Sequence, residues 1–175
     1  MSQENYKSVL KRIKTFVFDV DGVFTANSIL LTEKGEMLRT MNVRDGYAVQ
    51  LAVRQGFHIV IISGGNSEAV RTRFEYLGVK NIFLGAGKKI EVFENYFTEK
   101  GLDKSKTLYM GDDIPDFEVM QKVGLACCPA DATPEIKSIS HYISPKNGGD
   151  GCVRDVLEQT MKVQGAWMKD EAFQW

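Results

Sequence analysis

Paired acids follow the first apolar run of the chain and are the clearest candidates for chemistry. Asp19 and Asp21 come at the end of the run at residues 15–19, and Gly22 follows them. Side chains two residues apart in an extended segment point the same way, so these carboxylates repel unless a cation or proton intervenes. Mg²⁺ suits this place because it prefers hard oxygen ligands and retains waters or phosphate oxygens. A plain Asp-Gly turn is the open alternative.

A second group of acids follows the apolar run at residues 107–110. It comprises Asp112, Asp113 and Asp116, with Gly111 in front. Asp113 or Asp116 can complement the positive end of a following helix. Three acids and a glycine exceed what a cap needs, however, and two acidic strand ends in one α/β domain can converge on a metal ion.

Two further segments offer groups that bind phosphate. Ser63 and Gly64 supply a hydroxyl and backbone N–H groups between a strand and a helix, although, taken alone, these residues fit an ordinary β-α turn better than a phosphate site. Lys88 and Lys89 begin a predicted helix, where a lysine opposes the helix dipole. This misfit indicates that one of them neutralises a phosphate, while the other is a surface lysine.

Short apolar runs alternate with helical patterns along the chain, which predicts an α/β fold. We expect strands at residues 15–19, 57–63, 81–84, 106–110, 125–128 and 142–143, and a hairpin from 28–31 and 36–41. We expect helices at residues 45–55, 67–78, 88–100, 114–123 and 150–163. The predicted architecture is a doubly wound (Rossmann-like), mostly parallel sheet with a small β-hairpin and no cap domain. Ligands of such sheets bind beyond the carboxyl ends of the strands.

Length and composition fit one globular domain. The chain has 175 residues, of which 43% are hydrophobic and 26% charged, with a formal net charge of −1. This charge argues against a generic nucleic-acid surface. The three cysteines (Cys127, Cys128 and Cys152) form no CxxC pair, and no apolar segment resembles a signal peptide or membrane span. We therefore expect a cytoplasmic protein. His58 and His141 are expected to be structural.

Taken together, the four polar segments resemble the four motifs of the haloacid dehalogenase superfamily in order and strand context. The matching residues are Asp19-Val20-Asp21-Gly22, Ser63, Lys89 and Gly111 to Asp116. The resemblance implies a phosphatase with Asp19 as nucleophile and Asp21 as general acid and base. It also implies Mg²⁺ bound by Asp19, Asp112 and the backbone carbonyl of Asp21. Asp113 would support a metal-bound water or Lys89, and Ser63 and Lys89 would bind the phosphoryl oxygens.

A closer resemblance covers nearly the whole chain. The segments at 42–47 and 148–154, and the ending after Gln164-Gly165, are similar to those of 3-deoxy-D-manno-octulosonate 8-phosphate (KDO 8-phosphate) phosphatases, which act in lipopolysaccharide biosynthesis. This resemblance implies a substrate pocket formed by Asn42, Val43, Arg44, Asp45, Gly46, Gln50, Gly64, Arg73 and Lys89. Asp45 is equally plausible as a helix N-cap.

The chain departs from that family in its second motif. The family often has Thr-Gly-Arg there, whereas this chain reads Ser63-Gly64-Gly65, which keeps the hydroxyl and removes a cation. The exact sugar acid therefore stays open. The alternatives are a phosphatase for a nine-carbon sialic-type acid 9-phosphate, a catalytically silent regulatory domain, and a phospho-receiver.

The gaps between motifs leave no room for a cap domain, so a neighbouring subunit is expected to close the site. The relatives implied by the resemblance are homotetramers in which hairpins and C-terminal tails complete shared sites. We expect one domain at residues 1–165 and a tail at 166–175 that reaches a neighbouring subunit. The tail carries Trp167, Met168, Phe173 and Trp175, and aromatic residues favour interfaces. Packing on the chain's own core is the alternative.

Overall fold

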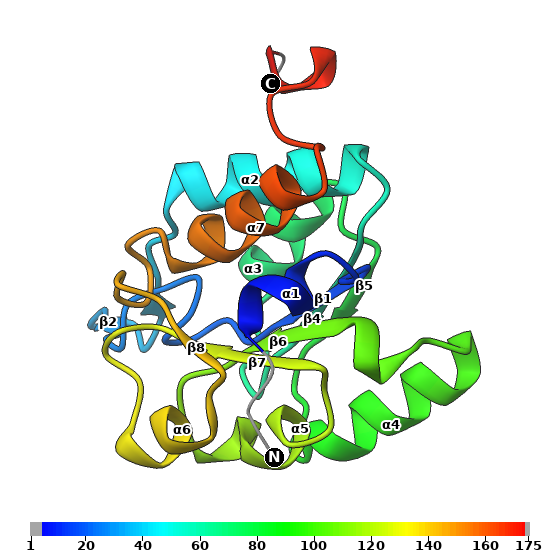
Figure 1. The fold of residues 1–175 in the computed structure, drawn as a ribbon. Helices are drawn as coiled ribbons and strands as arrows, with labels where there is room; N and C mark the ends of the chain where they lie inside the picture. Colours follow the sequence, from blue (N-terminus) through cyan, green and yellow to red (C-terminus); the bar gives the residue numbers. More distant parts are fainter. Residues whose placement is uncertain (1–4, 174–175) are drawn as a thin grey trace.

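A parallel six-stranded sheet organises the chain (Figure 1), and the computed structural model describes residues 5–173 of it. In spatial order the strands are β5 (Asn81–Phe83), β4 (His58–Ile62), β1 (Thr15–Phe18), β6 (Thr107–Met110), β7 (Leu125–Cys128) and β8 (Tyr142–Ile143). The central strand β1 pairs with both β4 and β6, so that Phe18 lies opposite Ile61 and Met110. The segments that follow these three strands therefore emerge side by side at one edge of the sheet.

Helices cover both faces of the sheet (Figure 1). One layer contains α1 (Tyr6–Leu10), α2 (Val43–Arg54), α3 (Glu68–Tyr76) and α7 (Cys152–Val163). The other contains α4 (Lys89–Lys100), α5 (Phe117–Met120) and α6 (Pro134–Ile139). Phe16 and Phe18 of β1 belong to the first core and Val17 to the second, as the alternation of side chains along a strand requires. The doubly wound α/β architecture predicted from the sequence is confirmed.

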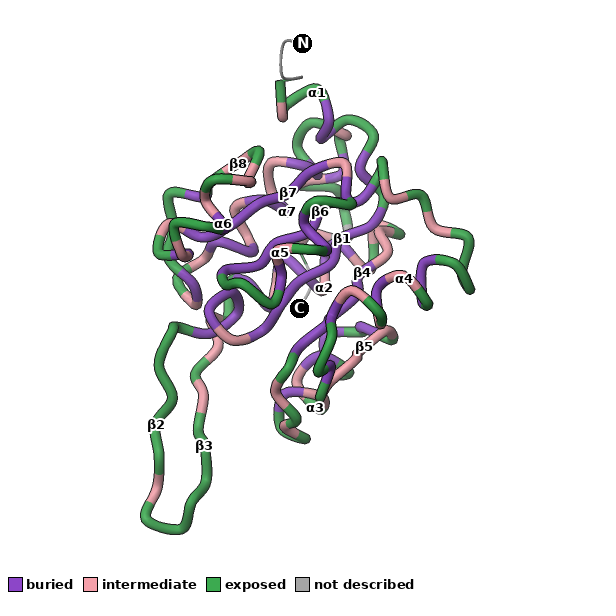
Figure 2. Tube along the Cα trace, turned by 90° about the horizontal axis from the view of Figure 1, so that it is seen from below, coloured by how far each residue is buried: buried purple, intermediate pink, exposed green. Residues whose placement is uncertain are grey.

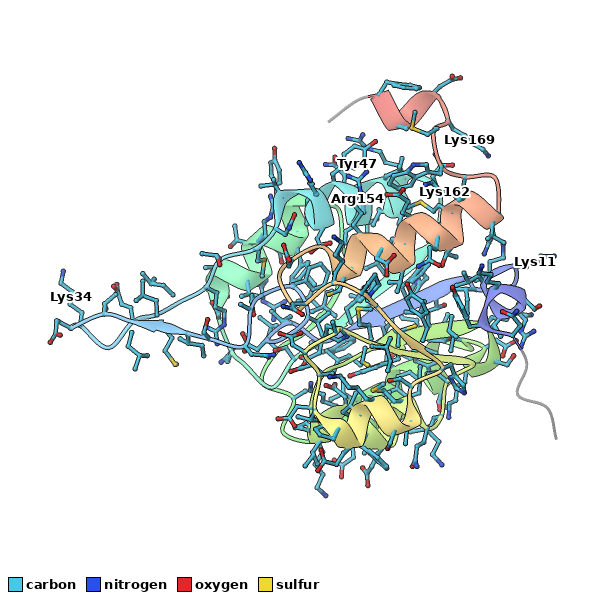
Figure 3. All side chains as sticks on the ribbon, turned by 60° about the vertical axis from the view of Figure 1, so that its left-hand side comes forward. Lys11, Lys34, Tyr47, Arg154, Lys162 and Lys169 are labelled. Carbon is cyan, nitrogen blue, oxygen red and sulfur yellow. The ribbon has the colours of Figure 1, made fainter. Side chains whose placement is uncertain are left out.

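A hairpin projects from this body (Figure 2). It pairs β2 (Leu30–Leu31) with β3 (Met37–Leu38) in antiparallel register, and Lys34 lies at its far end (Figure 3). All four strand residues are exposed. Such a short ladder supplies little stability by itself. The hairpin was predicted, but its strands are shorter than expected.

Several helix boundaries differ from the predictions. Helix α2 starts at Val43 rather than Asp45, because the side chain of Asn42 accepts hydrogen bonds from the N–H groups of Arg44 and Asp45. Asp45 is therefore not the cap. The helix predicted at 114–123 is divided into a 3₁₀ turn, η2 (Ile114–Asp116), and the short α5. Helices α1 and α6 and the 3₁₀ turns η1 (Lys104–Lys106) and η3 (Asp170–Phe173) were not predicted.

The described part of the C-terminal tail packs on its own chain. Ala166 is buried, and the ring of Trp167 meets that of Tyr47 edge to face with centroids 6.4 Å apart. The guanidinium of Arg154 lies 5.3 Å from the centre of the Trp167 ring, and the Tyr47 hydroxyl donates to the carbonyl of Ala172. Figure 3 shows Tyr47 and Arg154 below the tail. Trp175 lies outside the described residues.

The cysteines and the helices set two simple limits. Cys127, Cys128 and Cys152 are all buried as free thiols. Between residues 5 and 173, no helix combines the length and apolar character that crossing a bilayer requires.

The contacts of Trp167 lead to a prediction about stability. Truncation after Gly165 removes the ring that packs on Tyr47 and Arg154, and we expect the free energy of unfolding to fall by about 1–3 kcal/mol. Urea denaturation measures this change, and light scattering on the same samples reports assembly. Truncation after Lys169 keeps Trp167 and is the matched control, which should lose less. Equal stability of all three chains would contradict the packing role.

Candidate active site

Asp19 follows the central strand and is the first residue of the site. Its N–H donates to the carbonyl of Met110 on β6, which continues the ladder beyond β1. Its Oδ1 accepts a hydrogen bond of 2.7 Å from the N–H of Val20. Gly22, at a φ of 78°, turns the chain here, and a Cβ at this position would lie 2.1 Å from Oδ2 of Asp112. The glycine thus lets the loop after β1 pass against the second acidic loop.

Lys89 links two of the acids. Its Nζ lies 2.6 Å from Oδ2 of Asp19 and 2.7 Å from Oδ1 of Asp116. The hydroxyl of Tyr109, in the middle of β6, donates to the same Oδ1 at 2.5 Å. All four residues are buried. Because Lys89 begins α4 and Tyr109 comes from β6, the ion pairs fix that helix against the sheet at the site.

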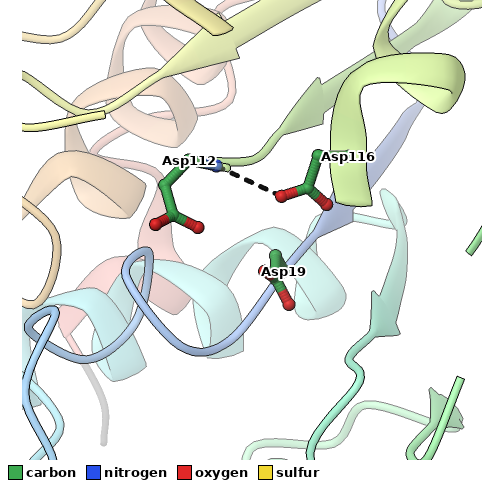
Figure 4. A group of neighbouring side chains, drawn as sticks. All are labelled: Asp19, Asp112 and Asp116. Carbon is green, nitrogen blue, oxygen red and sulfur yellow. Dashed lines mark hydrogen bonds between the residues drawn. The ribbon is translucent and has the colours of Figure 1, made fainter. Parts of the chain in front are cut away.

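Three carboxylates, of Asp19, Asp112 and Asp116, converge at this edge of the sheet (Figure 4). Ligand oxygens of Asp19, Asp112 and Asp116 all lie within 4.8 Å of one another. The N–H of Asp112 donates to Oδ2 of Asp116 at 3.2 Å. A Cβ at Gly111 would lie 2.3 Å from Cγ of Asp116, so the glycine makes room for that carboxylate.

The crowding of buried acids raises the pKa values of Asp19 and Asp112. Burial, and then the charge of Asp116, raise the pKa of Asp19 from 3.8 to about 7, against the lowering effect of Lys89. Burial, and then the charges of Asp19 and Asp116, raise the pKa of Asp112 from 3.8 to about 8. One lysine does not balance three carboxylates, so a further positive charge is needed to keep them ionised.

This donor set fits Mg²⁺, a hard cation that prefers carboxylate oxygens. Asp19 and Asp112 are the residues that would hold it. Both oxygens of Asp116 already accept hydrogen bonds from Lys89, Tyr109 and the N–H of Asp112. Asp116 therefore orients these groups rather than binding the ion.

The roles of Asp113 and Asp116 differ from those that the sequence suggested. Asp113 is exposed, and its Oδ1 accepts from the N–H of Ile114 at 2.8 Å, as a cap of η2 does. Lys89 is held by Asp116 and not by Asp113. Asp116 makes no side-chain capping hydrogen bond. The sequence placed Asp116 last among the three acids of the second cluster. This spacing alone did not distinguish a partner of Lys89 from a helix cap.

The other phosphate-binding candidates surround the same cleft, whose volume is about 640 Å³. Ser63, Gly64 and Gly65 follow β4 and line it opposite Asp112 and Asp113. The hydroxyl oxygen of Ser63 accepts from the N–H of Gly65 at 3.2 Å. The motif residues predicted from four separate segments therefore meet in one cleft.

Asp21 faces the cleft but is held by a residue that the sequence analysis missed. Nε of Arg39 lies 2.6 Å from Oδ1 of Asp21, and Nη2 lies 3.2 Å from Oδ2. Arg39 immediately follows β3 of the hairpin. No pattern around Arg39 indicated a site residue, because its partner is 18 positions away and the hairpin is irregular.

Of the predicted sugar-pocket residues, Gly64 and Lys89 line this cleft and the others do not. Asn42 and Arg44 line a separate cleft of about 580 Å³ beside α7, and Val43 is exposed. A Cβ at Gly46 would lie 2.4 Å from Nη2 of Arg73, so these two residues are neighbours. Arg73 also lines a cavity of about 270 Å³ together with Arg39.

Asp45 is buried on α2, and Gln50 of the same helix is half-buried. Asp45 accepts from the N–H of Arg154 at 2.7 Å, and burial raises its pKa from 3.8 to about 6. Oδ2 of Asp45 and Oε1 of Gln50 are buried oxygens without a hydrogen-bond partner among the described residues. The two histidines lie outside the cleft: His58 contacts the Tyr96 hydroxyl, and His141 accepts from the N–H of Ala126.

Comparison with known proteins shows the family to which the chain belongs. The fold and its four motif segments define a haloacid dehalogenase-like hydrolase, and the model of that family matches residues 81–156. The 3-deoxy-D-manno-octulosonate 8-phosphate phosphatase KdsC of Escherichia coli (strain K12) is 33% identical over 155 residues, which are 89% of this chain and 82% of that protein. The chain therefore belongs to the KDO 8-phosphate phosphatase family of haloacid dehalogenase-like hydrolases.

Solved structures resemble the chain over nearly its whole length. The KDO 8-phosphate phosphatase of Yersinia pestis has a TM-score of 0.89 at 29% identity and covers 93% of this chain and 88% of its own. That of Moraxella catarrhalis, in complex with magnesium, phosphate and KDO, has a TM-score of 0.88 at 30% identity and covers 93% and 94%. A cobalt-bound form from Haemophilus influenzae has a TM-score of 0.86 at 28% identity and covers 94% of both chains.

The raised pKa values predict how Mg²⁺ stabilises the protein. In the metal-free fold, Asp19 and Asp112 hold protons more tightly than in an unfolded chain. The stability this contributes is present below about pH 4 and is lost as the pH rises through about 7 and about 8. Mg²⁺ competes with these protons, so we expect the rise in melting temperature on adding Mg²⁺ to grow between about pH 6 and about pH 9.

Two asparagine variants test this expectation by differential scanning calorimetry. Asp112→Asn removes one charge from the cluster, so it should lose most of the Mg²⁺ effect and be more stable than wild type without metal near pH 9. Asp113→Asn, the matched control, should retain the Mg²⁺ effect. A Mg²⁺ effect that is independent of pH, or that survives in Asp112→Asn, would contradict the assignment.

Proposed function

We propose that this protein is a Mg²⁺-dependent phosphatase that hydrolyses KDO 8-phosphate through a phospho-aspartate at Asp19, in lipopolysaccharide inner-sugar biosynthesis in the cytoplasm. The observation that carries the proposal is the cluster of Asp19, Lys89 and Asp112 at one edge of the sheet, in a cleft open to a phosphate ester. The relatives named above support the substrate, since their names give this activity and one was solved with KDO.

The first step forms the phospho-enzyme. A carboxylate oxygen of Asp19 attacks phosphorus in line, and the bond from phosphorus to the sugar oxygen breaks. Asp21 donates a proton to that oxygen, because an alkoxide is a poor leaving group at neutral pH. Ser63 and Lys89 contact the phosphoryl oxygens, and Lys89 stays charged between Asp19 and Asp116.

The second step releases phosphate. Asp21, now ionised, takes a proton from water, and the oxygen of that water attacks phosphorus and frees the Asp19 carboxylate. When bound, Mg²⁺ neutralises charge on the phosphoryl oxygens and on the acids around them. Most of the rate enhancement then comes from positioned charges in a partly buried site.

Apart from Gly64 and Lys89, the residues expected to bind the sugar end do not line the cleft of a single chain. We propose that Asn42, Val43, Arg44, Asp45, Gly46, Gln50, Gly64 and Arg73 form the sugar-acid pocket within a homotetramer. The hairpin supports this assembly, because it exposes Ile29, Leu30, Leu31, Met37 and Leu38, and exposed apolar groups mark interaction surfaces. Met168 and Phe173 of the tail are also exposed and would reach a neighbouring subunit.

The substrate is tested with a panel of sugar-acid phosphates. We expect Mg²⁺-dependent phosphate release from KDO 8-phosphate, with a higher kcat/KM than for a nine-carbon sialic-type acid 9-phosphate. Asp19→Asn should show no turnover while remaining folded by circular dichroism, because an amide is not a nucleophile here. A preference for the nine-carbon substrate would change the substrate assignment. Turnover by Asp19→Asn would refute the mechanism, and absence of turnover in wild type would favour a regulatory domain.

The role of Asp21 is tested by the leaving group. Asp21→Asn should lower kcat/KM for KDO 8-phosphate by about 10²–10⁴-fold, the usual worth of a general acid. The loss should be at least about tenfold smaller for 4-nitrophenyl phosphate, whose phenolate leaves without a proton. Both values come from initial rates of phosphate release. Equal losses for the two esters would contradict the acid role.

A further inference from the structure

Asp21, the proposed acid and base, is held by the hairpin rather than by the sheet. The fork of Arg39 binds both of its carboxylate oxygens, at 2.6 and 3.2 Å. The Nη1 group of Arg39 also donates to the carbonyl of Met37 at 3.2 Å, which holds the guanidinium to its own strand. The Arg39 side chain is only 11% exposed, whereas that of Asp21 is 39% exposed. A two-point ion pair of this kind restricts the orientation of a carboxylate more than a surface pair does.

The space beside this pair is kept open by Gly65. A Cβ at this position would lie 3.2 Å from Oδ2 of Asp21, 3.5 Å from Oγ of Ser63 and 3.6 Å from Nη2 of Arg39. A longer side chain starting there would lie beside both the Asp21 carboxylate and the Arg39 guanidinium. A cationic side chain at position 65 would thus compete with Arg39 for the Asp21 carboxylate.

We propose that Arg39 is the positioning residue of Asp21, and that it supplies from the hairpin the cation that holds this carboxylate. The inference rests on the proposed function, since it assigns a role to Asp21 in that reaction. Arg39 sets the direction of the Asp21 carboxylate toward the leaving-group oxygen, and Gly65 makes this arrangement possible. A lysine would not reproduce it fully, because an ammonium is a point charge without the planar fork.

The test compares Arg39→Met, Arg39→Lys, Gly65→Arg and the double variant Arg39→Met/Gly65→Arg. Arg39→Met should lower kcat/KM for KDO 8-phosphate at least about tenfold, with a smaller loss for 4-nitrophenyl phosphate, as expected for a displaced general acid. Arg39→Lys should recover part of the loss. Gly65→Arg alone should also be impaired, because two guanidinium groups then compete for Asp21.

The double variant is decisive. If the two cations are interchangeable, it should exceed Arg39→Met in kcat/KM, so that the two changes are strongly non-additive. Lys34→Met, which removes an exposed cation from the same hairpin, is the control and should match wild type in activity. Melting temperatures show whether each variant folds. If Arg39→Met does not fold, Arg39→Lys, which retains the charge, takes its place in the comparison.

The outcomes separate this inference from the proposed function. Wild type without Mg²⁺-dependent turnover would overturn the function itself. Wild-type turnover with an unimpaired Arg39→Met, or with equal losses for both esters, would overturn the positioning role. A double variant no better than Arg39→Met would overturn the replacement of one cation by the other.

Discussion

Electrostatic repulsion among three buried carboxylates is the constraint on which the site depends. Asp19, Asp112 and Asp116 face one another across less than 5 Å, and Lys89 is the cation that pairs directly with two of them. The topology creates this conflict, because β1 and β6 are neighbours and the segments after them carry acids. Folding alone leaves an excess of negative charge, which burial makes expensive. The same imbalance prepares the cleft for a divalent cation and, through it, for a phosphate.

The surrounding residues hold these charges at close range. Tyr109 and Lys89 hold both the position and the orientation of the Asp116 carboxylate. Asp19 and Asp112 are therefore the acids available to a ligand in the cleft. Gly22 and Gly111 remove the Cβ atoms that would otherwise collide with Asp112 and Asp116. Both glycines thus have a steric reason: Gly22 makes room for a carboxylate of the other acidic segment, and Gly111 for a carboxylate of its own segment.

The sequence predicted the sheet, the hairpin and most of the acidic cluster, because these depend on local patterns. Strand ends followed by Asp19, Ser63 and Asp112 are visible in the order of residues, and parallel topology brings them together. The partner of Lys89 was not predictable, since Asp113 and Asp116 follow the same strand and only side-chain direction separates them. The start of α2 was mistaken for a related reason. Asn42 and Asp45 are both good caps, and the extended backbone at Asn42 decides between them. Arg39 lies in a hairpin whose side chains face solvent, so no hydrophobic alternation fixed where it points.

The position of the hairpin outside both cores has an evolutionary consequence. Its strands are two residues long and exposed, so substitutions there change the folding free energy little. The proposed nucleophile Asp19 and its neighbours Lys89, Asp112 and Asp116 are instead buried at the edge of the sheet, where substitutions are poorly tolerated. The exposed residues of the hairpin, with the exception of the half-buried Arg39, can therefore vary among descendants without disturbing the acids at the edge of the sheet.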